Sequence, residues 1–490
     1  MKNLKEKKNS MAGDVFSLSA SRLISYAVSM IGTMQLARFR SLVEFGTYSQ
    51  MLLAINLFVS IFSLGLPYCL NYFLARTESK KERNAFLSTY YLINTIIGVL
   101  IGIVLMLAIP LIEKYFQNYN ISNYWIFLVF YPLTMVITQS VENLLVVHKR
   151  SKQLAIYKIV HSFSVVFLIT LVKILGWSFS TYVHLYLCSE ACFMLAVYLF
   201  AIKLDGMFVF KINKQTLKSI VVFAVPLGLS IAAGTLKAET DKLVIGLFYT
   251  TEEYAVYANA AKELPLTFIA TSTTAVLLPM ITKMLKNNDE QSAVNLWKET
   301  TTISFLINAF FAFGLFFFSK EAMIFLYSEK YVTGATVFGI YSLVMLFRST
   351  YFGMVLQSYG KTKIILQASV SSLIINLVLN FLLCKTIGFI GPAIATIISM
   401  IWNSGFQLFK SAEMLNMSVK RIFPWKSIFC ISAVNIILGV IFKLLQSILP
   451  LEQWINNTAE AIILGFCWLI AYVIIFRKLI KDKIKILQNH

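Results

Sequence analysis

Residues 87–111 read LSTYYLINTIIGVLIGIVLMLAIPL and contain no charged side chain. A helix needs about 20 mainly apolar residues to cross a lipid bilayer, so this stretch is long enough to span one. Similar stretches follow one another along the chain with short gaps between them. Their approximate limits are 14–36, 46–74, 124–147, 154–175, 180–202, 219–247, 254–282, 299–318, 334–358, 364–385, 389–411, 425–446 and 456–476. The sequence therefore predicts an all-α, polytopic membrane protein with 14 transmembrane helices.

The composition excludes most other classes of protein. Of the 490 residues, 58% are apolar and 13% are charged, whereas an average soluble protein has about 25% charged residues. This balance excludes a soluble enzyme, a disordered protein and a secreted disulfide scaffold. A membrane β-barrel is not favoured, because its strands would show short alternating segments and not long apolar stretches. The net charge of +20 does not indicate nucleic-acid binding, because the cations lie mostly in the gaps between apolar stretches.

The distribution of positive charge predicts the orientation in the membrane. With the N-terminus inside, the inside segments hold 29 of the 43 Lys and Arg residues and the outside segments hold 8. Cytoplasmic loops are enriched in Lys and Arg, so both termini are expected to be cytoplasmic. The basic N-terminal segment has no convincing cleavage site after its apolar stretch and is expected to stay on the protein.

The chain contains an internal repeat with an offset of 209 residues. EFGTYS at 44–49 follows the first span, and EYAVYA at 253–258 follows the seventh. Six spans per copy preserve the orientation, so the copies are parallel and related by an axis along the membrane normal. The predicted parts are an N-terminal six-helix lobe, a cytoplasmic linker, a C-terminal six-helix lobe, and an additional helix pair with a basic tail. Their limits are 1–203, 204–218, 219–411 and 412–490.

Six cations fall inside the predicted spans. They are Arg22, Lys158, Lys237, Lys242, Lys262 and Arg348. Each costs about 2.5–3.5 kcal/mol at the centre of a lipid-facing helix, so most should face protein or water. The polar residues of the first span recur on one helical face. They are Asp14, Ser17, Ser21, Arg22, Ser25, Ser29 and Thr33.

The seventh span repeats this polar stripe with Ser230, Gly234, Lys237 and Asp241. Two equivalent stripes predict a polar cavity between the halves, where substrate sites of such proteins usually lie. We expect eight residues to line it. They are Arg22, Lys237, Lys262, Arg348, Ser21, Ser25, Ser29 and Asp241.

A purely structural role is the alternative for several of these charges. Lys237 and Asp241 are four residues apart on one helix and could simply neutralise each other. Lys158 lies near a span end, where its ammonium group could reach the membrane surface. Arg22 and Arg348 have no acidic residue at helical spacing. For Arg22, water and an anionic ligand are therefore the expected compensation.

Other intramembrane residues leave two roles open. Glu142 and Glu190 could pair with cations or carry protons, and the sequence does not decide between these roles. His161 and His184 have no carboxylate at helical spacing, which favours a packing role over a proton relay.

Signatures of enzymes are absent from the sequence. It contains no P-loop, no HExxH, no GxSxG and no paired-Asp motif, and no loop is long enough for a catalytic domain. The six cysteines lack metal-ligand spacing. We therefore expect no catalytic residue, no cofactor and no metal.

Three stretches resemble polysaccharide flippases of the multidrug/oligosaccharidyl-lipid/polysaccharide exporter superfamily. They are LARFRSLVEFGTYSQMLLAI at 36–55, ETDKLVIGLFYTTEEYAVYANA at 239–260 and GFIGPAIATIIS at 388–399. The resemblance covers nearly the whole chain. It implies a V-shaped, two-lobed transporter in a bacterial inner membrane that exposes a cationic central cavity to each side in turn. Arg22 falls where related lipid-linked precursor flippases have a cavity arginine.

The same resemblance implies a substrate, an oligosaccharide repeat unit on undecaprenyl pyrophosphate, exported for O-antigen in lipopolysaccharide, capsule or exopolysaccharide. H⁺ or Na⁺ could drive the cycle, and contact with polysaccharide polymerase machinery is left open. Two alternatives within the superfamily are a peptidoglycan-precursor flippase and a multidrug/cation antiporter. An antiporter should favour carboxylates in its cavity, the opposite of the balance here. A membrane-embedded sugar polymerase or ligase is the alternative from another class, and it would carry a large external catalytic loop.

Overall fold

The computed structural model describes residues 2–74, 76–77, 79–207, 214–262, 268–449 and 456–488. Within these residues every regular element is a helix, which confirms the all-α prediction. The helices up to the middle of the chain are α1 (Lys2–Phe39), α2 (Leu42–Phe62), α3 (Leu66–Leu74), α4 (Lys80–Phe116), α5 (Trp125–Thr138), α6 (Val141–Val147), α7 (Ser151–Ile174), α8 (Phe179–Asp205) and α9 (Lys214–Phe248). Those that follow are α10 (Thr251–Ala260), α11 (Phe268–Lys286), α12 (Glu290–Phe317), α13 (Ser319–Tyr327), α14 (Ala335–Ser342), α15 (Val344–Phe347), α16 (Met354–Ser358), α17 (Thr362–Ile387), α18 (Gly391–Met414), α19 (Val419–Ile422), α20 (Trp425–Ile448) and α21 (Asn457–Gln488).

The chain forms two compact units. The first contains residues 1–239 and 246–255, and the second contains residues 240–245 and 256–490. The division falls inside α9 and not in the 204–218 segment that the sequence indicates as a linker. The reason is that the first part of α9 buries Ile220 and Ala224 among residues of α3, α4 and α8.

Eleven helical segments of the described residues are long and apolar enough to cross a membrane. One of them, Thr362–Met414, contains both α17 and α18, which are joined by a 3-10 turn at Gly388–Ile390. Neither α1 nor the α10–α11 region is among the eleven. The chain is thus a multi-pass membrane protein, and the count of fourteen spans stays a prediction.

The internal repeat corresponds to a repeated helix start. At the beginning of α2, the amide of Glu44 donates to the hydroxyl of Ser41 at 3.2 Å, and the amide of Ser41 donates to the Glu44 carboxylate at 3.1 Å. At the beginning of α10, Thr250 and Glu253 make the same two bonds at 3.3 and 2.9 Å. Each pair is a capping box, which satisfies backbone donors that an isolated helix start leaves unpaired. The repeated glutamates therefore have a structural role.

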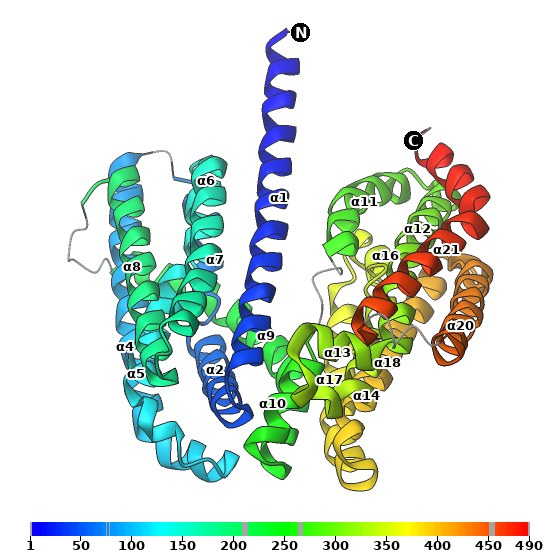
Figure 1. Ribbon diagram of the computed structural model, residues 1–490. Helices are drawn as coiled ribbons and strands as arrows, with labels where there is room; N and C mark the ends of the chain where they lie inside the picture. Colours follow the sequence, from blue (N-terminus) through cyan, green and yellow to red (C-terminus); the bar gives the residue numbers. More distant parts are fainter. Residues whose placement is uncertain are drawn as a thin grey trace. The chain divides into compact units, whose positions relative to one another are not determined.

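In the first unit α4, α5, α7 and α8 run side by side (Figure 1). Gly98 and Gly102 lie on the face of α4 that contacts α5. A Cβ atom on Gly102 would lie 2.1 Å from the carbonyl oxygen of Val129. This spacing of small residues allows two membrane helices to approach closely.

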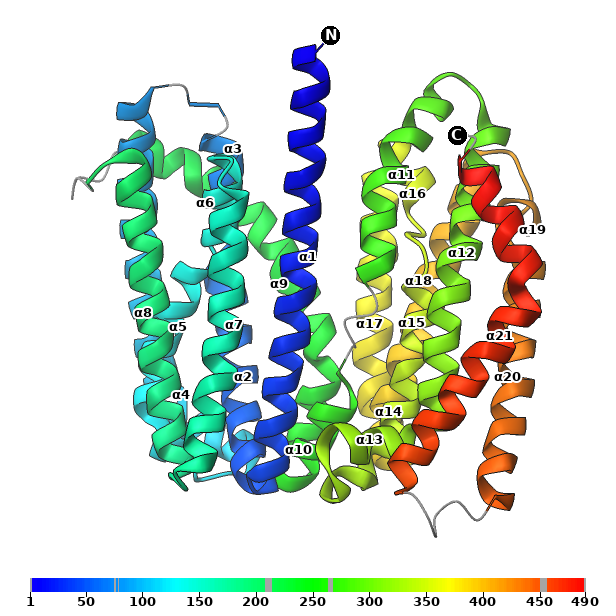
Figure 2. The same ribbon diagram turned by 45° about the horizontal axis from the view of Figure 1, so that its top comes forward.

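In the second unit α12 packs against both α20 and α21 (Figure 2). Trp468 of α21 is fully buried, and its ring stacks on that of Phe442 of α20 with 6.0 Å between the centroids. Lys443 of α20 donates to Glu321 of α13 at 2.8 Å. The additional helix pair is therefore part of the core of the second unit.

Candidate functional site

The predicted span 124–147 is interrupted. Helix α5 ends at Thr138 and α6 begins at Val141. At the break the buried hydroxyl of Ser140 donates to the carbonyl of Ile137 at 2.6 Å and lies 3.1 Å from the hydroxyl of Tyr91. Such serine bonds compete with the bonds of the helical backbone. The break places Glu142 in the first turn of a new helix.

Glu142 is shared by two cations from two other helices. The Nη2 atom of Arg22 in α1 contacts Oε1 of Glu142, and Nζ of Lys158 in α7 contacts Oε2. One carboxylate cannot neutralise two cations, so the cluster keeps a surplus positive charge. The side chains are 40% exposed for Arg22, 33% for Glu142 and 22% for Lys158. An anionic group could therefore reach this positive charge. A charged side chain within a membrane is costly, so its presence favours a functional role.

The serines of α1 lie near this cluster in the sequence and differ in burial. Helix α1 packs along α7. Ser21 is buried, Ser25 is half-buried and Ser29 is exposed. The polar stripe therefore runs from the packed face of α1 to its open face. The side chains of Asp14 and Ser17 lie outside the described residues.

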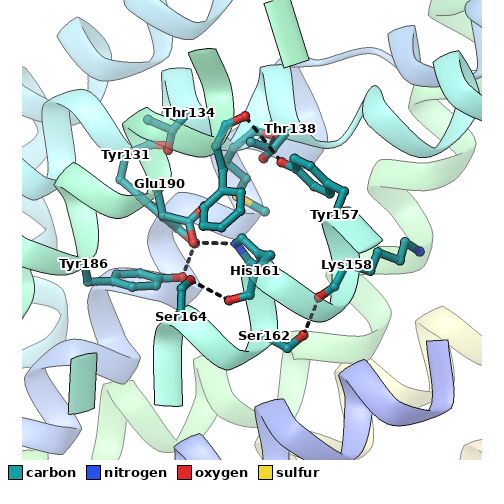
Figure 3. Close-up of polar contacts among 12 residues, drawn as sticks. Tyr131, Thr134, Thr138, Tyr157, Lys158, His161, Ser162, Ser164, Tyr186 and Glu190 are labelled. Atoms are coloured by element: carbon teal, nitrogen blue, oxygen red, sulfur yellow. Dashed lines mark hydrogen bonds and ion pairs between the residues drawn. The ribbon is translucent and has the colours of Figure 1, made fainter. Parts of the chain in front are cut away.

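A second acid of the first unit pairs with a histidine (Figure 3). Nε2 of His161 in α7 lies 2.8 Å from Oε1 of Glu190 in α8. The Glu190 side chain is 5% exposed, whereas that of His161 is 32% exposed. The hydroxyls of Tyr131 and Tyr186 lie 3.1 Å apart beside this pair. The histidine can therefore connect a buried carboxylate with the outside of the unit.

Helix α7 joins the two clusters. Lys158 and His161 are three residues apart, so they lie on neighbouring turns of one helical face (Figure 3). A movement of α7 would affect both the Glu142 cluster and the Glu190 pair. This arrangement can link the binding of an anion to the binding of a proton.

In the second unit Asp241 is buried and bonded to tyrosines. Its Oδ2 accepts hydrogen bonds from Tyr341 at 3.0 Å and from Tyr257 at 3.4 Å. Lys262 lies two residues after the end of α10 and is exposed, and residues 263–267 of the predicted span 254–282 lie outside the described part of the chain.

The second unit also has an interrupted span. The predicted span 334–358 consists of α14, α15 and α16, with Arg348 exposed at the end of α15. Ser349 accepts a hydrogen bond from Asn308 of α12 at 3.2 Å. After a slip of three residues the repeat has an offset of 212, as between Gly176 and Gly388, so Gln139 and Ser140 correspond to residues 351 and 352, which lie in the gap between α15 and α16. Interrupted spans at corresponding positions are typical of transporter binding sites.

A model of the polysaccharide biosynthesis protein family matches residues 11–285, which is more than half of the chain. The chain belongs to the polysaccharide biosynthesis protein family. The resemblance to the multidrug/oligosaccharidyl-lipid/polysaccharide exporter superfamily is thereby confirmed.

Two curated relatives are named as flippases. The probable low-salt glycan biosynthesis flippase of Haloferax volcanii is 25% identical over 41% of this chain and 43% of its own length. The probable lipid II flippase of Rickettsia prowazekii is 23% identical over 48% of each chain. The chain thus spans less than half the length of these two relatives.

Solved structures show a similar fold over much longer stretches. A lipid II flippase in an inward closed conformation has a TM-score of 0.75 at 17% identity, covering 94% of this chain and 99% of that one. An inward-facing multidrug resistance transporter has a TM-score of 0.66 at 14% identity, covering 83% and 99%. At these identities the similarity concerns the fold alone.

The eight residues predicted to line a cavity are divided between the two compact units of the chain. Ser21, Arg22, Ser25, Ser29 and Lys237 belong to the first unit, and Asp241, Lys262 and Arg348 belong to the second. A common cavity stays a prediction.

The structure adds partners that the sequence did not indicate. We expected water and an anionic ligand to compensate the charge of Arg22. This expectation was incomplete, because Glu142 contacts Arg22 from a position 120 residues away. His161, expected to have a packing role, contacts a carboxylate on another helix. Among the residues that the structure describes, no group of three or more His, Cys, Asp or Glu side chains could hold a metal ion.

Proposed function

We propose that this protein is a flippase for an undecaprenyl-pyrophosphate-linked oligosaccharide in a bacterial inner membrane. It would move the repeat unit of O-antigen, capsule or exopolysaccharide from the cytoplasmic to the outer leaflet. The observation that carries the proposal is the surplus positive charge of the cluster that Arg22 and Lys158 form with Glu142 within apolar helices. Membership of the polysaccharide biosynthesis protein family and the names of the relatives support the same substrate class.

The chemistry of the cluster suits a pyrophosphate. Phosphate oxygens accept charge-assisted hydrogen bonds from guanidinium and ammonium groups, as a carboxylate does. An arriving pyrophosphate would compete with Glu142 for Arg22 and Lys158. The cations would then exchange Glu142 for the pyrophosphate, whose charge would compensate the surplus that Glu142 alone leaves.

Transport would follow by alternating access. In this proposal Lys237, Lys262 and Arg348 extend the positive surface, and Ser21, Ser25, Ser29 and Asp241 offer hydrogen bonds to the sugar. The lipid tail would stay in the bilayer while the headgroup crosses.

We further propose that a proton drives the cycle through the Glu190–His161 pair. The two groups are 2.8 Å apart, and α7 connects His161 to Lys158. A proton on Glu190 would remove the charge of this carboxylate, weaken its bond to His161 and loosen the contact of α7 with α8.

The experiment uses purified protein in liposomes with a fluorescent undecaprenyl-pyrophosphate oligosaccharide, and measures the fraction protected from an impermeant glycosidase. Arg22→Ala should lower the transport rate at least about tenfold, because a charge-assisted bond contributes about 1.5–3 kcal/mol. Its membrane abundance should change little, since Lys158 still neutralises Glu142. Glu142→Gln should instead lower the abundance, because it leaves two cations without a partner.

The matched control is Lys173→Ala, which removes an exposed cation at the other end of α7. It should transport at the normal rate. Normal transport per molecule in Arg22→Ala would contradict the proposed role of this residue.

A peptidoglycan-precursor flippase is the second candidate, favoured by the similarity in fold to a lipid II flippase. Supplying lipid II in the same assay separates the two candidates, since the natural headgroup should be moved faster. The multidrug antiporter alternative is not favoured, because a cationic substrate would be repelled by the surplus positive charge.

A further inference from the structure

A basic hollow lies in the second unit at the start of α20 and the end of α21. It has a volume of about 780 Å³ and is lined by the third and fourth turns of α12, by α19, by the start of α20 and by the last turns of α21. Its charged lining residues are Lys298, Glu299, Lys420, Lys426 and Lys483. Glu299 forms an ion pair with Lys483. Within the described part of the chain the other three lysines form no ion pair, so the hollow is strongly positive.

The helix start at the hollow adds to this positive character. Helix α20 begins after Pro424, which provides no side-chain cap, and Pro424 and Lys426 both line the hollow. The first amide groups of a helix have no acceptor within the helix and carry the positive end of its dipole. The amide of Trp425 donates to the carbonyl of Phe423 at 2.9 Å, and the next two residues of this turn, Lys426 and Ser427, line the hollow together with the other lysines, which is a suitable arrangement for an anion.

The hollow lies at the level of a membrane where phosphate groups occur. The apolar segment of α20 begins at Trp425, and that of α21 ends at Lys481. Trp425 is 46% exposed, and its indole donates to the carbonyl of Val419 at 3.1 Å, which fixes the ring at the wall of the hollow. Tryptophan side chains favour the headgroup region of a bilayer.

We propose that this hollow binds the headgroup of an anionic phospholipid, such as phosphatidylglycerol or cardiolipin. Basic pockets between membrane helices recognise phosphate-bearing headgroups in this way. The apolar helices beside the hollow would accommodate the acyl chains, which a soluble phosphate lacks. The site belongs to the second unit alone and does not depend on the flippase proposal. A lipid held there would join α12, α20 and α21 and stabilise the unit.

The test is native mass spectrometry of the full chain in detergent, titrated with cardiolipin, phosphatidylglycerol or phosphatidylethanolamine. We expect the two anionic lipids to bind and the third to bind weakly. In the triple variant Lys298→Gln, Lys420→Gln, Lys426→Gln the affinity for cardiolipin should fall at least about tenfold, because each lysine near a membrane contributes about fivefold.

A matched variant carries Lys283→Gln, Lys361→Gln and Lys363→Gln, which removes three exposed lysines outside the hollow. It should keep the affinity of the original protein. Equal losses in both variants would overturn the proposal, because the attraction would then be general. Displacement of cardiolipin by millimolar inorganic phosphate would identify a soluble anion as the ligand and would also overturn it. The single variant Lys426→Glu serves if the triple variant is poorly produced, and unchanged binding in it would count against the site.

Discussion

The side chain of Glu190 is 5% exposed and lies among those of Tyr131, Tyr157 and Tyr186 (Figure 3). Its partner is Nε2 of the partly exposed His161 at 2.8 Å. A carboxylate in such a place is costly unless it is paired, and acidic groups within membrane segments often carry protons.

Glu190→Gln should therefore uncouple transport from a proton gradient. Glutamine keeps the shape and the hydrogen-bonding capacity but cannot bind and release a proton. We expect accumulation driven by a pH gradient to fall to the level without a gradient, while exchange between equal concentrations continues. Transport of labelled lipid-linked oligosaccharide in liposomes with and without a gradient measures both. A variant that still accumulates substrate would exclude Glu190 as the proton carrier, and loss of exchange as well would point to damaged folding.

The contacts among the intramembrane charged residues could not be predicted from the sequence, although the location of these residues inside predicted spans could. Hydropathy shows that Arg22, Glu142 and Glu190 lie within apolar stretches, and helical spacing tests only partners on the same helix. Glu142 and Arg22 are 120 residues apart, so their contact depends on how α1, α6 and α7 pack. Nonlocal packing of this kind leaves no periodic signal in one sequence.

The beginning of α10 lies against the beginning of α2 at a glycine. A Cβ atom on Gly46 would lie 2.2 Å from the carbonyl oxygen of Thr251. Gly46→Ala should therefore force the two helix starts apart and destabilise the protein by about 1–3 kcal/mol, as overpacking usually does. The change is measured as a lower midpoint of thermal unfolding in detergent.

Gly405→Ala in α18 is the control, because nothing lies within 4 Å of the Cβ position there. It should leave the midpoint unchanged or raise it slightly, since alanine favours helix more than glycine does. Equal midpoints for the two variants would show that the corner at Gly46 tolerates a methyl group.

At the level of elements, local chemistry made much of the fold predictable. The apolar stretches coincide with helices, and the repeated glutamates of the 209-residue repeat correspond to two capping boxes. The breaks after Thr138 and after Phe347 were not predicted, because neither break contains a proline and the predicted spans 124–147 and 334–358 run through them, although Gly353 lies at the second break. The buried serine bonds that accompany the breaks depend on neighbouring helices, so they appear only in the structure.

For the whole molecule, the number of spans decides on which side of the membrane each segment lies. The distribution of Lys and Arg places residue Lys218 inside, Lys173 outside and Lys478 inside. Only α8 separates Lys173 from Lys218, whereas eight predicted spans separate Lys218 from Lys478. Comparing positions 173 and 218 therefore tests whether α8 crosses the membrane. Comparing positions 218 and 478 tests whether the number of spans between them is even.

Single cysteines at these three exposed positions, in a variant without the six natural cysteines, provide the measurement. In intact cells an impermeant maleimide should label position 173 and should label positions 218 and 478 only after the membrane is opened. Labelling of 173 and 218 from the same side would mean that α8 does not cross, despite its apolar window. Labelling of 478 from outside, with 218 inside, would give an odd number of crossings after α8. Such a result would replace fourteen spans by an odd total, so at least one predicted span of the second copy or of the additional helix pair would not cross the membrane.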